Sequence, residues 1–171
     1  ENTNTFPDEA FWSYLLKYVD KNRTGTLSQE ERYAVKVIEV EKKNIHSLKG
    51  IEFFPNLKKL YCRENQLTEL DVSKNKELES LLCNKKQLTE LDVSQNTKLT
   101  ALYFVSNKIT SLQADNCTNL TVIFTGSNKY KVEVYKKTRI LDPDILPGNF
   151  DISRVRNLKG ATQNADGTLT V

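Results

Sequence analysis

With 171 residues the chain is long enough for one compact domain or one elongated repeat domain with terminal caps, but too short for two large cores. Its 25 Lys and Arg residues against 22 Asp and Glu residues leave a formal charge of only +3, with both signs interspersed, which argues against nucleic-acid or membrane-surface binding. No apolar run approaches the roughly 20 residues that a membrane span needs, and the polar first residues do not resemble a signal peptide.

An amphipathic helix is predicted near the start of the chain. Pro7 stands where a first helical turn tolerates proline, and apolar residues recur at helical spacing at Phe11, Leu15, Tyr18 and Val19. We expect a helix of about three turns that packs Phe11 or Trp12 on the first coil of the repeat described below.

The segment directly after this helix has the spacing of an EF-hand calcium loop. Its candidate oxygen donors are Asp20, Asn22, the Thr24 hydroxyl, the Thr26 carbonyl, Ser28 through water and bidentate Glu31. The same segment also fits a metal-free structure, because Ser28 and Glu31 have the spacing of a helix capping box. Only Asp20 and Glu31 are carboxylates, so we favour an EF-hand-like cap without metal and expect no other cofactor; calcium stays an open alternative that would bind weakly.

A 21-residue repeat fills the middle of the chain. Three ungapped copies cover 57–77, 78–98 and 99–119; a weaker copy at 35–56 precedes them and a partial one begins at 120. Parallel strands are predicted at 37–41, 59–63, 80–84, 101–105 and 122–126. Apolar repeat positions 1, 4 and 6 should form the core, with position 4 supplying Ile38, Leu60, Leu81, Leu102 and Ile123 and position 6 supplying Val40, Cys62, Cys83 and Phe104.

Polar and sulfur-containing positions of the repeat also have predicted structural roles. Position 9 holds Asn65, Asn107 and Asn128, whose amides can bridge backbone groups where the chain leaves each strand, and Lys86 replaces them in one coil, which we expect to be looser. A second strand-like element at 70–72 and 91–93 precedes Ser-x-Asn turns. The three cysteines, Cys62, Cys83 and Cys117, make an odd number without zinc-ligand spacing, so we interpret them as buried thiols.

These units resemble the 21-residue, cysteine-containing repeats of bacterial cell-surface leucine-rich proteins of the internalin kind, over residues 35 to about 130. We predict an α/β-type solenoid, mostly β, with a right-handed leucine-rich-repeat coil, a helical N-terminal cap and a β C-terminal cap. The domains are an EF-hand-like cap at 1–34, repeats at 35–134, and a C-terminal cap or the start of a following β domain at 135–171. A helix-loop-helix cap before the repeats is also what the resemblance implies.

The last part of the chain is predicted to be β. Alternation from Tyr130 to Lys137 indicates a strand that closes the solenoid, before breaks at Pro143 and Pro147. An Asp166-Gly167 turn precedes another alternating segment, so further protein is expected after residue 171.

An exposed apolar row is predicted on the strand face of the repeats. Strand alternation directs position 5 outward, which gives Tyr61, Leu82, Tyr103 and Phe124 in successive coils, with Lys59, Arg63, Asn84 and Val105 beside them. One interpretation is a binding face for a protein or a glycan, because exposed contiguous apolar patches are uncommon on monomers. The other is a ladder of cross-strand contacts that serves folding alone, or that residues 140–171 cover.

No catalytic constellation is recognisable in the sequence. The single histidine, His46, is expected in a solvated turn, and thiols in the core are unreactive. We therefore interpret the chain as a non-enzymatic, monomeric recognition module, extracellular or on a bacterial cell surface, although neither a signal nor an anchor is visible in this chain. It should neither bind nucleic acid nor insert into a membrane. The alternatives are a structural spacer without its own ligand and an intracellular adaptor, the latter suggested only by the reduced cysteines.

Overall fold

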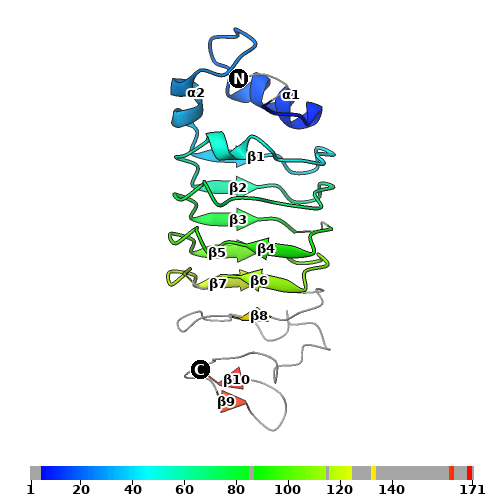
Figure 1. Cartoon of the computed structure of the whole chain (residues 1–171), viewed down its shortest axis with the longest axis vertical. Helices are drawn as coiled ribbons and strands as arrows, with labels where there is room; N and C mark the ends of the chain where they lie inside the picture. Colours follow the sequence, from blue (N-terminus) through cyan, green and yellow to red (C-terminus); the bar gives the residue numbers. More distant parts are fainter. Residues whose placement is uncertain are drawn as a thin grey trace.

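The computed structural model describes residues 5–84, 87–114 and 116–124, and the backbone of 132–133, 162–163 and 169–170. The described coils stack along one axis as a solenoid that is mostly β (Figure 1). One parallel sheet contains, in order, β1 (Val37–Glu39), β2 (Lys59–Tyr61), β3 (Ser80–Leu82), β5 (Ala101–Tyr103) and β7 (Val122–Phe124). Each strand lies within a predicted segment, so the repeat register is confirmed.

The strands are shorter than predicted, but the pairing of neighbouring coils continues beyond them. Lys59 pairs with Ser80, and Ser80 with Ala101, which is the expected 21-residue step. After the strands end, the Cys62 amide still donates to the Leu82 carbonyl at 2.9 Å, and the Cys83 amide to the Tyr103 carbonyl at 2.8 Å. These bonds link the coils along the buried column at position 6.

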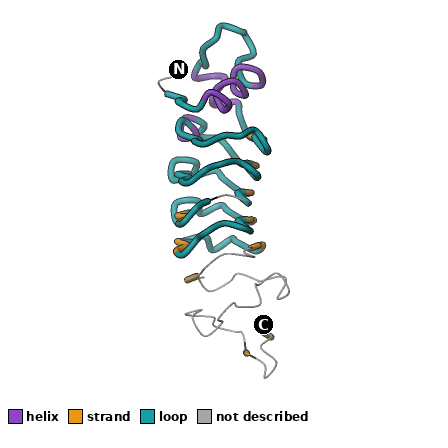
Figure 2. The backbone as a smooth tube through the Cα atoms, turned by 90° about the vertical axis from the view of Figure 1, so that its right-hand side faces the viewer, coloured by secondary structure: helices purple, strands orange, loops and turns teal. Residues whose placement is uncertain are grey.

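A second parallel sheet lies across the core from the first and contains β4 (Glu90–Asp92), β6 (Ser111–Gln113) and β8 (Val132–Glu133). The predicted strand at 91–93 is confirmed at Glu90–Asp92, but the one at 70–72 is wrong. The preceding coil forms a 3-10 helix η1 (Ile51–Phe53) at this place, and a helix offers no ladder to a neighbouring strand. Most of the remaining coil is loop (Figure 2).

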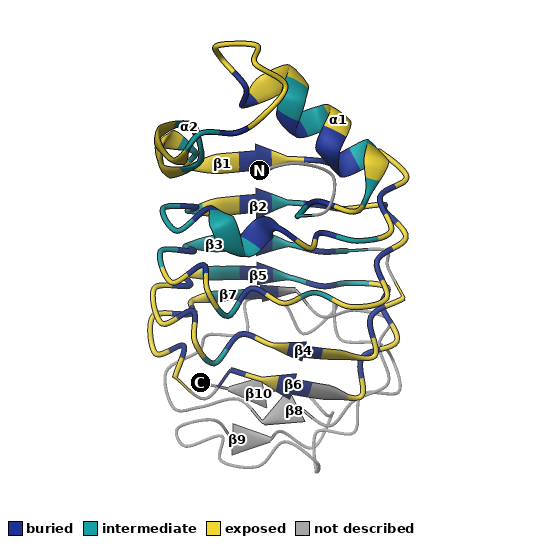
Figure 3. Cartoon of the chain, turned by 45° about the horizontal axis from the view of Figure 1, so that its top comes forward, coloured by how far each residue is buried: buried dark blue, intermediate teal, exposed yellow. Residues whose placement is uncertain are grey.

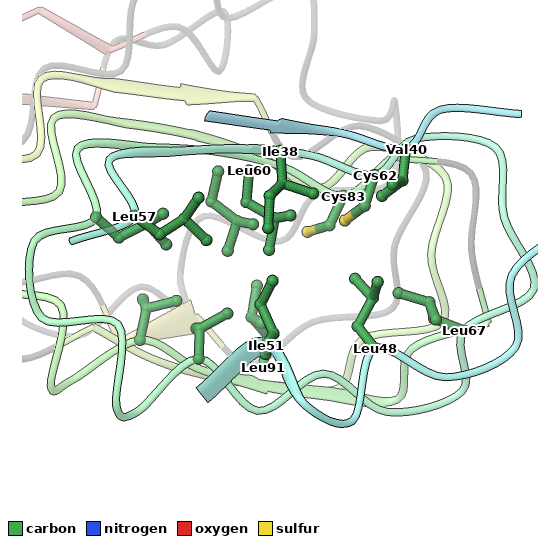
Figure 4. Packing of buried hydrophobic residues seen from close by; sticks show 14 of the residues in the cluster. Ile38, Val40, Leu48, Ile51, Leu57, Leu60, Cys62, Leu67, Cys83 and Leu91 are labelled. Atoms are coloured by element: carbon green, nitrogen blue, oxygen red, sulfur yellow. The ribbon is translucent and has the colours of Figure 1, made fainter. Parts of the chain in front are cut away.

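The core fills the space between these two sides of each coil. Ile38, Leu60, Cys62 and Cys83 point inward from one side, opposite Ile51 and Leu91 from the other (Figure 4). The expected columns are buried: Leu60, Leu81, Leu102, Cys62, Cys83 and Phe104 have no exposed surface. All three cysteines are buried thiols, as predicted. Each fully buried leucine stabilises the fold by about 1.5–3 kcal/mol relative to exposure.

The predicted role of the position 9 asparagine is confirmed at Asn65. Its side-chain amide donates to the carbonyls of Val40 and Cys62, and its Oδ1 accepts from the amides of Lys43 and Ile45, both at 3.0 Å. Asn107 donates in the same way to Cys83 and Phe104. Lys86 and Asn128 lie outside the described residues, so the looser coil expected at Lys86 stays a prediction.

Two short helices lie over the first coil, α1 (Glu9–Tyr18) and α2 (Gln29–Ala34) (Figures 1 and 3). Phe11, Trp12 and Leu15 are buried, as expected for the apolar face of α1. The helix begins at Glu9 rather than at Pro7, because the Asp8 side chain caps it by accepting from the Phe11 amide at 2.9 Å. Tyr18 was expected on the apolar face but is 47% exposed, since its ring packs on Tyr14 instead of entering the core.

Two C-terminal strands, β8 and β10 (Leu169–Thr170), lie where the sequence predicted strands, and β9 (Thr162–Gln163) was not predicted. Strand β8 lies within the alternating segment after Tyr130 and extends the second sheet beside β6. The backbones of β9 and β10 pair antiparallel. The Asp166-Gly167 turn, Pro143 and Pro147 lie outside the described residues. No helix in the described part of the chain has the length and hydropathy to cross a membrane.

Candidate ligand-binding face

The strand-face strip comprises the position 5 residues Tyr61, Leu82, Tyr103 and Phe124. The parallel register places Tyr61 beside Leu82, Leu82 beside Tyr103, and Tyr103 beside Phe124. The Phe124 side chain lies outside the described residues. Tyr61, Leu82 and Tyr103 are half-buried, so the row is less exposed than the sequence predicted. Strands about 4.8 Å apart bring in-register side chains into contact, and each covers part of its neighbour.

Polar side chains border the strip, and they differ in whether another residue already binds them. The Nε and Nη2 groups of Arg63 donate to the two carboxylate oxygens of Glu41, at 2.5 and 3.1 Å, and this hydrogen bonding raises the pKa of Arg63. Asn84 accepts from the Val105 amide at 2.9 Å through its Oδ1. Lys59 is exposed and forms no ion pair with any described residue. Of the two predicted cations, Lys59 therefore has its charge available to a partner.

The polarity of the face changes along the solenoid. The first two coils (35–56 and 57–77) present charged residues on this face, namely Glu39, Glu41, Lys59 and Arg63. The next two coils (78–98 and 99–119) present Ser80, Asn84, Ala101 and Val105, which carry no charge. All these residues except the exposed Glu39, Lys59 and Arg63 are half-buried. The face thus combines an uncharged surface over later coils with charged groups toward the N-terminal helices.

The six residues of the predicted calcium loop are joined by hydrogen bonds within one loop. Asp20 accepts from the amides of Thr24 and Gly25, at 3.1 and 2.8 Å, and Asn22 Oδ1 also accepts from the Thr24 amide at 3.1 Å. The Thr24 hydroxyl donates to the Thr26 carbonyl at 3.2 Å. Gly25 adopts a left-handed φ of 74°, which the turn requires. The carboxylate of Asp20 is thus already hydrogen-bonded to backbone amides.

Glu31 closes the loop and caps helix α2 at the same time. Its Oε1 accepts from the amides of Lys21 and Asn22, at 2.8 and 3.2 Å, and its Oε2 from Ser28 at 3.0 Å. The Ser28 hydroxyl accepts from the Glu31 amide, which confirms the capping box. These bonds, with that from the Ser28 amide foremost, hold the pKa of Glu31 below its ordinary value. Calcium binding itself stays a prediction.

A groove of about 910 Å³ lies on the opposite side of the coils. The sequence did not predict this groove. The residues that line it belong to four coils, and they come together only when the coils stack. Its charged lining includes Glu69, Asp71, Glu90, Asp92, Lys49 and Lys74. The backbone amide of Ser73 lowers the pKa of Asp71. Among the described residues no group of three His, Cys, Asp or Glu side chains could hold a metal ion.

His46 lies in an exposed turn, as predicted, and its backbone amide donates to Asp8 at 2.7 Å. Cys62 and Cys83 follow Tyr61 and Leu82 in the chain, but their side chains are buried in the core. The strip can therefore make apolar, hydrogen-bonding and ionic contacts.

Comparisons with known proteins agree with this architecture. No family model matches the sequence. Internalin J of Listeria monocytogenes serotype 4b (strain F2365) is 33% identical over 70 residues, which are 41% of this chain and only 8% of that protein. Among solved structures, an internalin (inlF) of L. monocytogenes has a TM-score of 0.59 at 21% identity and covers 84% of this chain and 54% of its own.

A second solved structure, internalin C2 (inlC2) of L. monocytogenes, has a TM-score of 0.52 at 21% identity and covers 76% of this chain and 69% of its own. At this identity the structural likeness shows the fold. Together with the Internalin J match, it confirms the resemblance to internalin-type leucine-rich repeats that the sequence indicated. The chain spans about half of the inlF structure and a small part of Internalin J.

Proposed function

We propose that this chain is a non-enzymatic recognition module that binds a protein or a glycan through the strand-face strip, in an extracellular or cell-surface setting. The observation that carries the proposal is the in-register row of Tyr61, Leu82 and Tyr103, which keeps part of its surface exposed on three successive strands. Aromatic side chains that are partly pre-ordered make effective contact residues, because little conformational entropy is lost when they bind.

The surroundings of the strip also support binding. Lys59 and the Arg63–Glu41 pair border it with groups that can select a partner by charge, while Ala101 and Val105 extend its uncharged part. The likeness to Listeria internalins supports placing the protein outside the cell, as does the resemblance to bacterial cell-surface repeat proteins.

A structural spacer is the second candidate, and one specific observation favours it. The strip residues are half-buried and contact one another across strands, as a ladder that only stabilises the sheet would do. If the chain is only a spacer, no ligand should lose affinity when the strip residues are replaced.

The deciding experiment compares the wild-type chain with the double variant Tyr61→Ala/Tyr103→Ala on a random-peptide display library and a glycan array. The matched control is Thr68→Ala/Thr89→Ala. Both threonines belong to the repeats and line the groove on the opposite side of the coils. Each tyrosine truncation should cost about 1–3 kcal/mol of binding. Identical ligands for wild type and the tyrosine variant, or none for either, would reject the binding function in favour of the spacer.

A further inference from the structure

The strand-face strip continues onto helix α1 through Tyr14. The Tyr14 hydroxyl accepts a hydrogen bond from the Glu39 amide at 3.1 Å, and Glu39 is the register partner of Tyr61. Tyr14 is half-buried, and its ring lies 4.8 Å from the ring of Tyr18, which is 47% exposed. The N-terminal helix therefore adds two aromatic side chains to the charged end of the strip.

Two lysines lie against these rings. Lys17 Nζ is 5.2 Å from the centre of the Tyr18 ring, and Lys43 Nζ is 5.9 Å from that of Tyr14. Both lysines are exposed. We call Tyr14, Lys17, Tyr18 and Lys43 the basic–aromatic corner.

Like Lys59, these two cations form no ion pair with a described residue, whereas other cations near the strip do. Lys42, Lys58 and Arg63 each have a carboxylate partner, at 3.7, 2.7 and 2.5 Å. Lys17 and Lys43 have no carboxylate partner within the described part of the chain. A ring face attracts an ammonium group without neutralising it, so the corner keeps two positive charges beside exposed apolar surface. Such a surface is complementary to an anion attached to an apolar group.

We propose that the basic–aromatic corner binds an acidic segment of a protein partner whose apolar side chains lie on the strand-face strip. The inference rests on the proposed binding function of that strip. An acidic peptide fits better than a uniform polyanion, because the Glu39 carboxylate stands on the strand between the corner and Tyr61 and repels a chain that is charged throughout. A peptide can place carboxylates at the corner and apolar residues farther along.

The spacing of the coils defines the sequence of such a segment. Glu39, whose amide contacts Tyr14 of the corner, lies three coil steps from Tyr103, about 14 Å at a strand spacing of about 4.8 Å. An extended peptide rises about 3.3 Å per residue, so about four residues cover this distance. The bound segment should therefore carry Asp or Glu within about four residues of aromatic or aliphatic side chains.

The test begins with selection of random peptides from a display library on the full chain. Selected peptides should be enriched in Asp or Glu close to apolar residues. They should then be measured on Lys17→Ala/Lys43→Ala and on the control Lys49→Ala/Lys74→Ala, which removes the same charge from the opposite groove. We expect the corner variant to weaken binding by about fivefold or more, the control to leave it unchanged, and added salt to reduce the difference.

Two outcomes separate this inference from the proposed function. If peptides or glycans bind, lose affinity with Tyr61→Ala/Tyr103→Ala, and are indifferent to the corner variant, the inference is wrong while the binding strip stands. If no ligand depends on either the tyrosines or the lysines, both are wrong. Circular dichroism of each variant checks that it is folded, because Lys17 and Lys43 are exposed and their truncation should not alter the structure.

Discussion

Cys117 holds the position in its coil that Asn96 holds one coil earlier, and its thiol donates to the corresponding carbonyls. The Asn96 amide donates to Val72 at 2.9 Å and to Asn75 at 3.0 Å, and Cys117 Sγ donates to Val93 at 3.1 Å and Asn96 at 3.5 Å. Asn75 begins the series by donating to Ile51 and Phe54. The Ser-x-Asn turns thus contain a second ladder of buried donors that joins the coils.

The ladder predicts a graded response at Asn96. Replacement by Ala leaves the Val72 and Asn75 carbonyls without their donor, which should cost about 1–3 kcal/mol of unfolding free energy. Asn96→Cys should cost less, because a thiol can donate weakly, as Cys117 does. Urea unfolding of the two variants measures the difference. Equal losses for Ala and Cys would show that the thiol bonds contribute nothing.

The strip residues should be coupled energetically only to their immediate neighbours. Tyr61 and Leu82 are register partners, so a double-mutant cycle with Ala should give about 0.2–1 kcal/mol of coupling. Tyr61 and Tyr103 are separated by a coil, about 10 Å, and their coupling should be close to zero. Denaturant unfolding of the single and double variants provides both values. Strong coupling between the two tyrosines would mean that the strip acts as one folding unit.

Asp8 should matter more for stability than an ordinary helix cap. One carboxylate oxygen caps helix α1, and the other accepts from the amides of His46 and Ser47, at 2.7 and 3.1 Å. Asp8→Ala should therefore destabilise the fold by about 2–4 kcal/mol, since both a cap and a link to the first coil are lost. Ser28→Ala, which removes only the cap of α2, should cost about 0.5–2 kcal/mol. Thermal unfolding of both variants should give this order, and the reverse order would contradict the link.

Glu31 should make stability depend on pH. Its folded-state pKa is lowered by the backbone amides of Ser28, Asn22 and Lys21, so the ionised form stabilises the folded state. This contribution is fully present above the unfolded-state pKa of about 4.3 and is lost as the pH falls through the folded-state value. Wild type should be more stable than Glu31→Gln at pH 7, and their melting temperatures should converge in acid. A gap that stays constant with pH would exclude this mechanism.

Calcium should have little effect on the melting temperature. Asp20 and Glu31 already accept backbone amides through their carboxylate oxygens, and ion binding would have to compete with these bonds. For a dissociation constant of about 10 mM, calcium at about 1 mM adds under about 0.1 kcal/mol of stability. Differential scanning calorimetry with calcium and with a chelator measures the effect. A rise of many degrees that Glu31→Gln abolishes would establish a calcium site.

The amino-acid sequence by itself determined the repeat register, the core columns and the position of the strip. These features depend on a 21-residue period and on strand alternation, which are local properties that repeat at Leu60, Leu81 and Leu102. The capping box at Ser28 and Glu31 was visible for the same reason, because its partners are three residues apart.

Only the tertiary structure decided features that depend on contacts between coils or with the N-terminal helices. The strip is half-buried because neighbouring coils cover part of each side chain. No strand forms at 70–72, where the preceding coil is helical and offers no ladder on that side. The contacts of Tyr14 with Glu39 and of Lys43 with Tyr14 join residues about 25 to 30 positions apart, with no repeat to relate them. The basic–aromatic corner therefore follows from how α1 packs on the first coil, and periodicity alone carries no information about that packing.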